Sequence, residues 1–272
     1  MNNLIVRALT GAVFVAVMVG GMLYGPLTFG LLFLVITALT TWEFTGIMSA
    51  RDDVSLNRMI TTVASCCLFL GSWGYANGLA QTPAAFAPWL LSLIYLFVEE
   101  LYLQEDSPLN NWAYTMMAQL YIALPFSLLC FLESSYQSAG MLSLSIFIFL
   151  WCNDTGAYLS GSLLGRHKLF PRVSPGKSWE GSIGGGLLCV GVSQLVAHYV
   201  TVLPPLVWAG FALVVVVFGT WGDLVESLLK RSLGIKDSGN ILPGHGGMLD
   251  RFDSSLLAIP AVMIYLLSLS VM

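Results

Sequence analysis

The chain has 272 residues, of which 57% are hydrophobic and only 10% are charged. Soluble domains carry about 25% charged residues, so this composition, with a mean hydropathy of +0.80, excludes a water-soluble globular protein. The net charge of -4 excludes a nucleic-acid partner, because the few cations cluster in short loops and form no broad basic surface.

Nine apolar runs are long enough, or nearly long enough, to cross the roughly 30 Å hydrocarbon core of a bilayer. They fall near 8–24, 27–48, 59–80, 84–98, 112–132, 141–164, 182–201, 205–229 and 254–272. The run at 84–98 is short, so we expect it to be tilted or to extend into neighbouring residues. A cleaved signal peptide is the alternative to a first span, but no cleavage site precedes a soluble domain. The sequence predicts an all-α, polytopic membrane bundle of about nine helices.

The positive charges predict the orientation of this bundle. All eleven Lys and Arg residues fall in alternate connecting segments, 1–7, 49–58, 99–111, 165–181 and 230–253. The positive-inside rule therefore places the N-terminus and these segments in the cytoplasm. We expect one membrane domain over 1–272, with lipid-facing spans in 1–140 and catalytic spans with cytoplasmic loops in 141–272. The compact length and the lack of targeting extensions favour the inner (plasma) membrane of a cell.

Four ionisable side chains stand out within the spans, namely Glu43, Asp154, Asp223 and Glu226. Charged groups at membrane depth are costly and mark functional sites by default. Asp223 and Glu226 are three positions apart and share a helix face, and Asp223 has no evident cation on its own helix. Glu226 is open to two interpretations: a site residue, or an i, i+4 ion pair with Lys230. The pattern assigns no role to Glu43.

Two more aspartates, Asp250 and Asp253, begin the last span. The loop at 230–249 must fold back to join two neighbouring helices, and this can bring Asp250 beside Asp223. Converging carboxylates repel each other unless a cation lies between them. Because the donors are oxygen atoms, Mg²⁺ is the expected ion, with Asp154 as a supporting ligand together with Asp253.

A basic segment, GRHKLFPRVSPGKSWE, occupies 165–180 and is kept from forming a helix by its prolines and Gly176. Its residues 174–178 offer hydroxyls, backbone donors and the Lys177 charge, a combination suited to phosphate. It lacks the spacing of a Walker A loop. The alternative is a basic patch that only satisfies topology or binds anionic lipid.

The segment 153–158, NDTGAY, places several polar side chains in the sixth span, where they would line an aqueous cavity. Gly156, Gly161 and Gly165 could serve that cavity or close helix packing. The five cysteines lie in apolar runs without a CxxC pair, so we expect neither disulfides nor a zinc site.

Three segments resemble blocks of the phosphatidate cytidylyltransferase (CDP-diacylglycerol synthase) family. They are 153–158, 174–181 (SPGKSWEG) and 227–253 (SLLKRSLGIKDSGNILPGHGGMLDRFD). The resemblance covers roughly 150–260, and the first half matches only as a set of hydrophobic spans. It implies transfer of CMP from CTP to phosphatidic acid by a membrane-embedded, Mg²⁺-dependent, dimeric enzyme. It also implies that Asp223 and Asp250 bind the metal, and it is compatible with a potassium ion beside the magnesium.

The remaining expected roles follow from phosphate chemistry. Cations would neutralise the substrate phosphates, and this set comprises Lys177, Lys230, Arg231, Lys236 and Arg251. Ser174, Ser178 and Asn153 would bind substrate. The backbone at Gly246 and Gly247 would approach a phosphate closely because glycine tolerates unusual dihedral angles, or His245 would donate to the departing pyrophosphate.

The expected partners are CTP, phosphatidic acid, the bilayer and a second copy of the chain, with the active site facing the cytoplasm. Rival interpretations are a CTP-using polyprenol or phytol kinase, a synthase acting on an ether lipid, an ion transporter and a noncatalytic scaffold.

Overall fold

A computed structural model describes residues 3–241 and 246–270, with side chains over 8–241 and 246–269. The helices are α1 (Asn3–Leu23), α2 (Pro26–Met48), α3 (Arg58–Ala76), α4 (Ala87–Leu103), α5 (Pro108–Met117), α6 (Leu124–Tyr136), α7 (Met141–Leu164), α8 (Trp179–Tyr199), α9 (Pro205–Ser232) and α10 (Leu249–Ser270). In the described chain, eight helical segments are long and apolar enough to cross a membrane, and Ala8–Leu23 is a shorter apolar helix. The prediction of an all-α, polytopic membrane protein is confirmed.

The short fourth apolar run was expected to be tilted or to extend into neighbouring residues, and the structure shows that it extends. A 3₁₀ turn over Pro83–Phe86 leads directly into α4, so the span covers Pro83–Leu103, 21 residues. Proline is well suited to the start of a helix, because its missing amide hydrogen would have no intrahelical partner there.

The fifth span is one continuous run of 29 residues, Pro108–Tyr136, interrupted by a π-helical turn over Ala118–Ala123. Pro125 follows this turn and lacks the amide hydrogen that would close an α-helical turn, which accounts for the local widening. Gln119, in the π turn, donates to the Thr61 carbonyl (3.2 Å) and the Ser65 hydroxyl (3.0 Å) of α3. The widened turn therefore carries a buried polar link between two spans.

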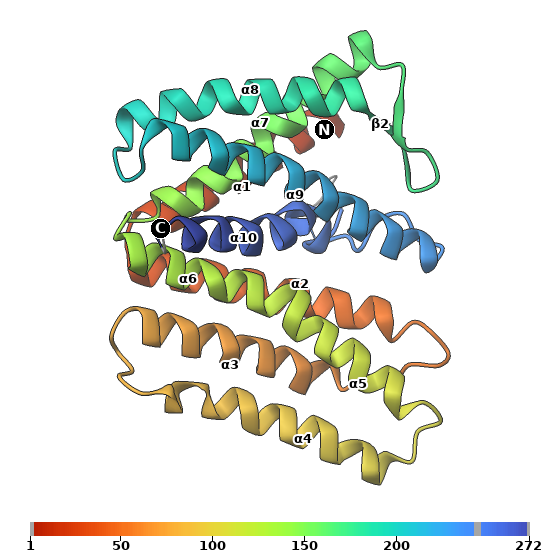
Figure 1. Ribbon diagram of the computed structural model, residues 1–272. Coiled ribbons are helices and arrows are strands. Elements are labelled where there is room, and N and C mark those ends of the chain that lie inside the picture. The colour runs from red at the N-terminus through yellow and green to blue at the C-terminus, as the bar shows by residue number, and fades with distance from the viewer. Residues whose placement is uncertain (1–2, 242–245, 271–272) are drawn as a thin grey trace. The chain divides into compact units, whose positions relative to one another are not determined.

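The chain folds as two compact units, whose elements are labelled in Figure 1. Unit 1 comprises Met1–Gly140 and Asp237–Arg251, and unit 2 comprises Met141–Lys236 and Phe252–Met272. In unit 1, α3 lies at the centre and packs against α2, α4 and α6. The five cysteines are free.

In unit 2, α8 packs against both α7 and α9. Glycines allow α7 and α8 to approach closely: a Cβ atom on Gly156 would lie 2.9 Å from the Gly185 Cα, and one on Gly181 would lie 2.9 Å from the Ala157 carbonyl oxygen. These contacts favour the helix-packing interpretation of Gly156. The aromatic core includes Phe149 and Phe211, whose ring centroids are 5.8 Å apart.

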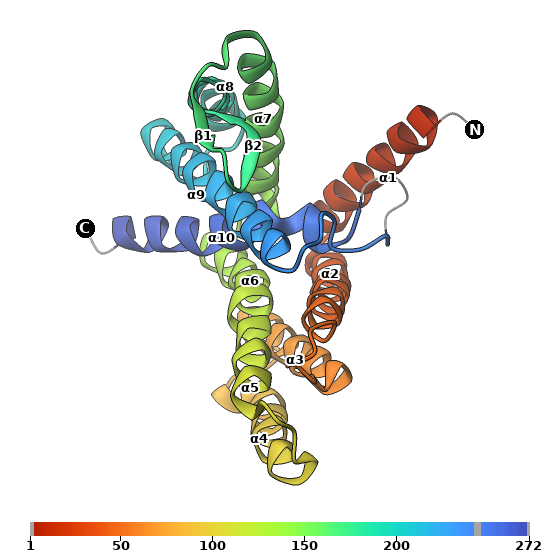
Figure 2. The ribbon, with the colours of Figure 1, turned by 90° about the vertical axis from the view of Figure 1, so that its right-hand side faces the viewer.

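An antiparallel hairpin connects α7 to α8 (Figure 2). Its strands are β1 (Lys168–Phe170) and β2 (Ser174–Ser178), with Lys168 paired to Ser178 and Phe170 to Ser174. The sequence predicted that this basic segment is not helical, but it did not predict the hairpin.

Candidate functional site

The hairpin is anchored at its base by the first turn of α8. The Glu180 carboxylate accepts hydrogen bonds from the backbone N–H groups of Arg166 (3.1 Å) and His167 (3.2 Å), and it lies 2.6 Å from the His167 Nδ1 atom. The Ser178 hydroxyl caps α8 by accepting from the Gly181 N–H at 3.1 Å. The predicted substrate residue Ser178 therefore also has a structural role.

The hairpin presents Lys177 to α9, where its ammonium group forms an ion pair with the Asp223 carboxylate. Both side chains are half-buried, with 26% and 30% exposure. Asp223 also accepts from the Ser227 hydroxyl at 3.2 Å. The predicted phosphate-binding lysine and the predicted metal-binding aspartate thus meet. This pair could not be predicted from the sequence, because the cation comes from a separate element and not from the helix that carries Asp223.

Three predicted metal-binding aspartates belong to unit 2 and come from different helices. Asp253 of α10 lies within electrostatic range of Asp223 of α9 and Asp154 of α7, and also of Lys230. Gly222 allows α9 and α10 to approach, because a Cβ atom there would lie 2.7 Å from the Asp253 carbonyl oxygen. Within the described residues, no group of three or more His, Cys, Asp and Glu side chains has the proximity of a metal site. Direct coordination by these residues therefore stays a prediction.

A cavity of about 290 Å³ lies beside the hairpin in unit 2. Its polar lining comes from α7, β2, α8 and α9 and comprises Asn153, Asp154, Tyr158, Lys177, Ser178, Ser182 and Thr220. The 153–158 segment therefore does line a cavity, as the sequence predicted.

Asn153, a predicted substrate residue that lines this cavity, is buried, with 5% exposure. Its amide nitrogen lies 3.4 Å from the Thr220 hydroxyl, whereas its Oδ1 atom is buried and has no hydrogen-bond partner among the described atoms. Buried polar atoms are rarely left unpaired, so this oxygen is suited to a donor or cation from outside the chain.

Glu226 forms an i, i+4 ion pair with Lys230, which was one of the two interpretations of this residue. Its Oε2 atom lies 2.6 Å from the Lys230 ammonium nitrogen, and the two side chains are 0% and 13% exposed. The charge of Lys230 is therefore shared with a buried carboxylate.

Asp250 lies in unit 1, where it organises the loop that precedes α10. Its Oδ2 atom accepts from the backbone N–H groups of Ser238 (2.9 Å) and Gly247 (2.8 Å). Gly246 has a φ of 81°, which glycine adopts readily and other residues adopt rarely, and a Cβ atom there would lie 2.6 Å from Asp250 Oδ2. Because Asp250 and Asp223 belong to different units, their predicted convergence stays a prediction.

The carboxylate of Glu43, in α2, joins the same loop of unit 1. It accepts hydrogen bonds from the Met248 N–H at 2.7 Å and from the Ser238 hydroxyl. Glu43 was expected to be a costly charge within a span, but its partners lie far along the chain and could not be predicted from the sequence.

The other predicted site residues lie near the ends of these elements. Arg231 is exposed, and its guanidinium donates to the Ile235 carbonyl at 3.3 Å. Lys236 and Arg251 are exposed and Ser174 is half-buried. His245 lies outside the described residues.

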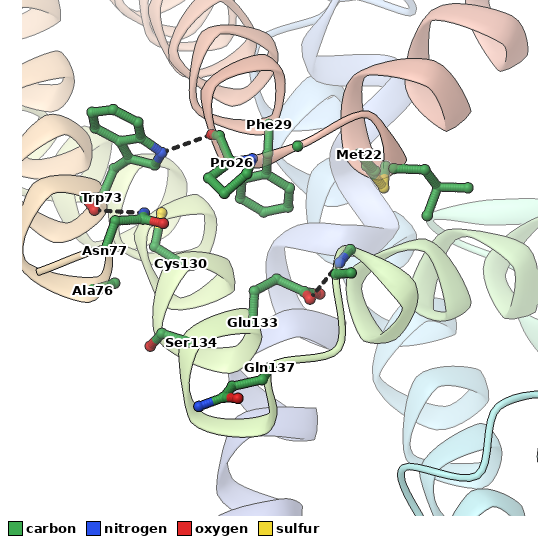
Figure 3. A pocket seen from close by; sticks show the side chains of 14 residues that line it. Met22, Pro26, Phe29, Trp73, Ala76, Asn77, Cys130, Glu133, Ser134 and Gln137 are labelled. Carbon is green, nitrogen blue, oxygen red and sulfur yellow. Dashed lines mark hydrogen bonds between the residues drawn. The ribbon is translucent and has the colours of Figure 1, made fainter.

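A second cavity, of about 420 Å³, lies in unit 1 (Figure 3). It is lined largely by apolar side chains, among them Phe29, Trp73 and Cys130. Glu133 is the one charged side chain among the described lining residues, and it accepts from the Gly140 N–H at 2.8 Å. A cavity lined by a carboxylate and by no cation is unsuited to phosphates, so we place the candidate site beside the hairpin.

The structure defines a multi-pass membrane protein in which Lys177 of a basic hairpin pairs with Asp223 of α9, beside a cavity that Asp154 of α7 also lines. The chain belongs to the cytidylyltransferase family, whose profile matches residues 5–269.

Similar curated proteins include the phosphatidate cytidylyltransferase of Staphylococcus aureus (strain COL), which is 43% identical over 157 residues, 57% of this chain and 59% of that protein. The phosphatidate cytidylyltransferase of Staphylococcus haemolyticus (strain JCSC1435) is 37% identical over 171 residues, 58% of this chain and 65% of that protein. The chain thus covers less than two thirds of the length of these relatives.

Proposed function

We propose that this protein transfers CMP from CTP to phosphatidic acid, forming CDP-diacylglycerol and releasing pyrophosphate. The observation that carries the proposal is the meeting of Lys177 and Asp223 beside a polar cavity in a member of the cytidylyltransferase family. The curated relatives named phosphatidate cytidylyltransferase support the choice of the acceptor lipid.

The proposed reaction is a direct displacement at the α-phosphorus. A phosphate oxygen of phosphatidic acid forms a bond to this phosphorus, the bond to the bridging oxygen of the β-phosphate breaks, and its electron pair leaves with pyrophosphate. The attacking phosphate monoester has a second pKa near 6, so it is largely a dianion at neutral pH and needs little general base. The main task is to neutralise two anions and align them, which suits Lys177, Lys230, Arg231, Lys236 and Arg251.

The donor set fits a hard divalent cation such as Mg²⁺, which prefers carboxylate and amide oxygens and keeps waters and substrate phosphate oxygens as further ligands. Asp223, Asp154 and Asp253 supply carboxylates in unit 2, and the unpaired Oδ1 of Asn153 supplies a neutral oxygen nearby. Asp250, in unit 1, is a predicted metal ligand on the family resemblance. A bound Mg²⁺ would offset the negative charge that accumulates on the reacting phosphates. Potassium as a second ion rests on the family resemblance alone.

We further infer that the site faces the cytoplasm of the inner (plasma) membrane. The positive-inside rule places the hairpin and the loop before α10 there, where CTP is available. The phosphatidic acid would enter from the inner leaflet. A homodimer is the assembly that the family resemblance favours.

The test is a product assay on purified protein with labelled CTP, Mg²⁺ and one acceptor at a time: phosphatidic acid, a polyprenol or an ether-lipid phosphate. We expect labelled CMP only in CDP-diacylglycerol, and no product after Mg²⁺ is chelated. Asp223→Asn and Asp250→Asn should each abolish turnover while the protein still inserts and folds. Transfer of a terminal phosphate to a polyprenol would instead indicate a lipid kinase and overturn the proposal.

A further inference from the structure

Glu43 connects α2 to a segment that lies 195 to 206 positions later in the chain, and all of these residues belong to unit 1. The carboxylate is buried, with 7% exposure of the residue. Its Oε2 atom accepts from the Met248 N–H at 2.7 Å, and its Oε1 atom accepts from the Leu249 N–H at 3.4 Å and from the Ser238 hydroxyl. An acidic side chain of the second span is thus the acceptor for the start of the last helix.

Two of these donors lie at the start of α10: Leu249 is the first residue of the helix, and Met248 directly precedes it. Amide groups in the first turn of a helix lack intrahelical acceptors, and the positive end of the helix dipole favours a carboxylate. Burying a carboxylate without hydrogen bonds is strongly unfavourable, and more so than burying a neutral polar group. Glu43 and the start of α10 therefore satisfy each other's buried polar groups.

The same network reaches Asp250 through one residue. The Ser238 hydroxyl, which donates to Glu43, accepts from the Asp250 N–H at 3.3 Å. The Ser238 N–H in turn donates to Asp250 Oδ2 at 2.9 Å. Ser238 therefore links the Glu43 carboxylate to both the backbone and the side chain of Asp250.

Glycines keep the loop in contact with the carboxylate. A Cβ atom on Gly239 would lie 2.8 Å from the Glu43 Cδ, and one on Gly247 would overlap Glu43 Oε1 and the Ser238 hydroxyl. The close contact with Glu43 thus explains why position 247 has no side chain. This explanation is separate from the predicted approach of the Gly247 backbone to a phosphate.

We propose that Glu43 is a positioning residue, which acts through Ser238 and the Met248 and Leu249 amides to hold the Asp250 carboxylate in the orientation that binds the divalent cation. This inference rests on the proposed function. Residues that orient metal ligands typically change metal affinity or activity by about 10–100-fold when they are replaced.

The chain offers a matched control in the same unit. Glu133 also accepts from a serine hydroxyl, that of Ser138, and from a backbone N–H just before a helix, that of Gly140 at 2.8 Å. This carboxylate organises the turn before α7, since both of these donors, Ser138 and Gly140, belong to that turn. Glu133→Gln and Ser138→Ala therefore repeat the chemistry of Glu43→Gln and Ser238→Ala at a different place.

The experiment compares these four variants with the unaltered protein in lipid nanodiscs. Amide hydrogen exchange of the peptide covering 246–251 is measured without Mg²⁺ or CTP, and the Mg²⁺ concentration for half-maximal rate is measured with both substrates saturating. For Glu43→Gln and Ser238→Ala we expect faster exchange and an increase of about tenfold or more in that Mg²⁺ concentration, with the rate recovering at high Mg²⁺. The control variants should keep the Mg²⁺ dependence and the exchange of the unaltered protein.

Unchanged exchange of the 246–251 peptide in Glu43→Gln would overturn the inference, whether or not the protein has the proposed activity. An equal loss of rate at all Mg²⁺ concentrations would overturn it too, because Glu43 would then support only the fold. Failure of the unaltered protein to make CDP-diacylglycerol would overturn the proposed function, and the exchange measurement would still report on the hydrogen bonds of Glu43.

Discussion

The Glu226–Lys230 pair gives a prediction that separates structure from chemistry at a predicted site residue. Replacing Lys230 with methionine keeps the length of the side chain and removes its charge. The Glu226 carboxylate, with 0% exposure and its Oε2 atom 2.6 Å from the lysine nitrogen, then lacks this counter-ion. Glu226→Gln, added to Lys230→Met, replaces the buried charge with a neutral amide of the same shape.

Removing one partner of a buried ion pair costs about 3–5 kcal/mol. At about 1.4 kcal/mol per factor of ten, Lys230→Met should lower the ratio of folded to unfolded protein roughly a hundred- to several-thousand-fold. Glu226→Gln alone should cost less, because the partly exposed lysine can extend its ammonium group toward water. The double variant should recover most of the stability lost in Lys230→Met.

The measurement is unfolding of the purified protein by a denaturing detergent, followed by circular dichroism, together with turnover of CTP and phosphatidic acid. If Lys230 also neutralises a substrate phosphate, the double variant will be stable but poorly active. Lys230→Met that unfolds at the same detergent fraction as the unaltered protein would refute the stability argument. A fully active double variant would show that Lys230 serves only the fold.

Two further predictions concern the hairpin and a surface pair. Lys177→Ala should reduce kcat/KM for CTP or phosphatidic acid about 10–100-fold in steady-state kinetics, because a charge-assisted hydrogen bond is lost. Arg172→Ala, in the exposed turn of the same hairpin, should have little effect on these kinetics. Equal kinetics for the two variants would contradict the prediction. The guanidinium group of Arg51 lies 2.8 Å from the Asp53 carboxylate and lowers the pKa of that exposed carboxyl. The stabilising contribution of this ion pair is therefore present at neutral pH and is lost as the pH falls through the lowered pKa of Asp53. Asp53→Asn should therefore flatten the acid dependence of thermal stability slightly, and an unchanged profile would show that the pair contributes nothing.

The membrane spans could be predicted from the sequence because each depends on a local property, the length of an apolar run. The length of the short run at 84–98 also has a local explanation, since Pro83 starts the helical segment and residues up to Leu103 extend it. The cavity lined by 153–158 could also be predicted from a local property, because polar residues in an apolar run must find a polar environment.

The partners of the charged residues could not be predicted, because they depend on how distant elements pack. Lys177 reaches Asp223 only because 168–178 forms a hairpin, and its proline and glycine residues give no alternating strand pattern. Glu43 finds its donors about two hundred positions later. Glu226 was the exception, since a partner four positions along the same helix was available to the sequence analysis.

The late arrival of residues 237–251 in unit 1 has a consequence for biosynthesis. Glu43, in the second span, is synthesised 205 residues before Met248, the residue whose amide donates a hydrogen bond to it. At roughly 5–20 residues per second, translation of this interval takes on the order of 10–40 s. During that time the newly inserted helix carries an acid whose native donors do not yet exist, so maturation of the first half must await completion of the nascent chain's final loop.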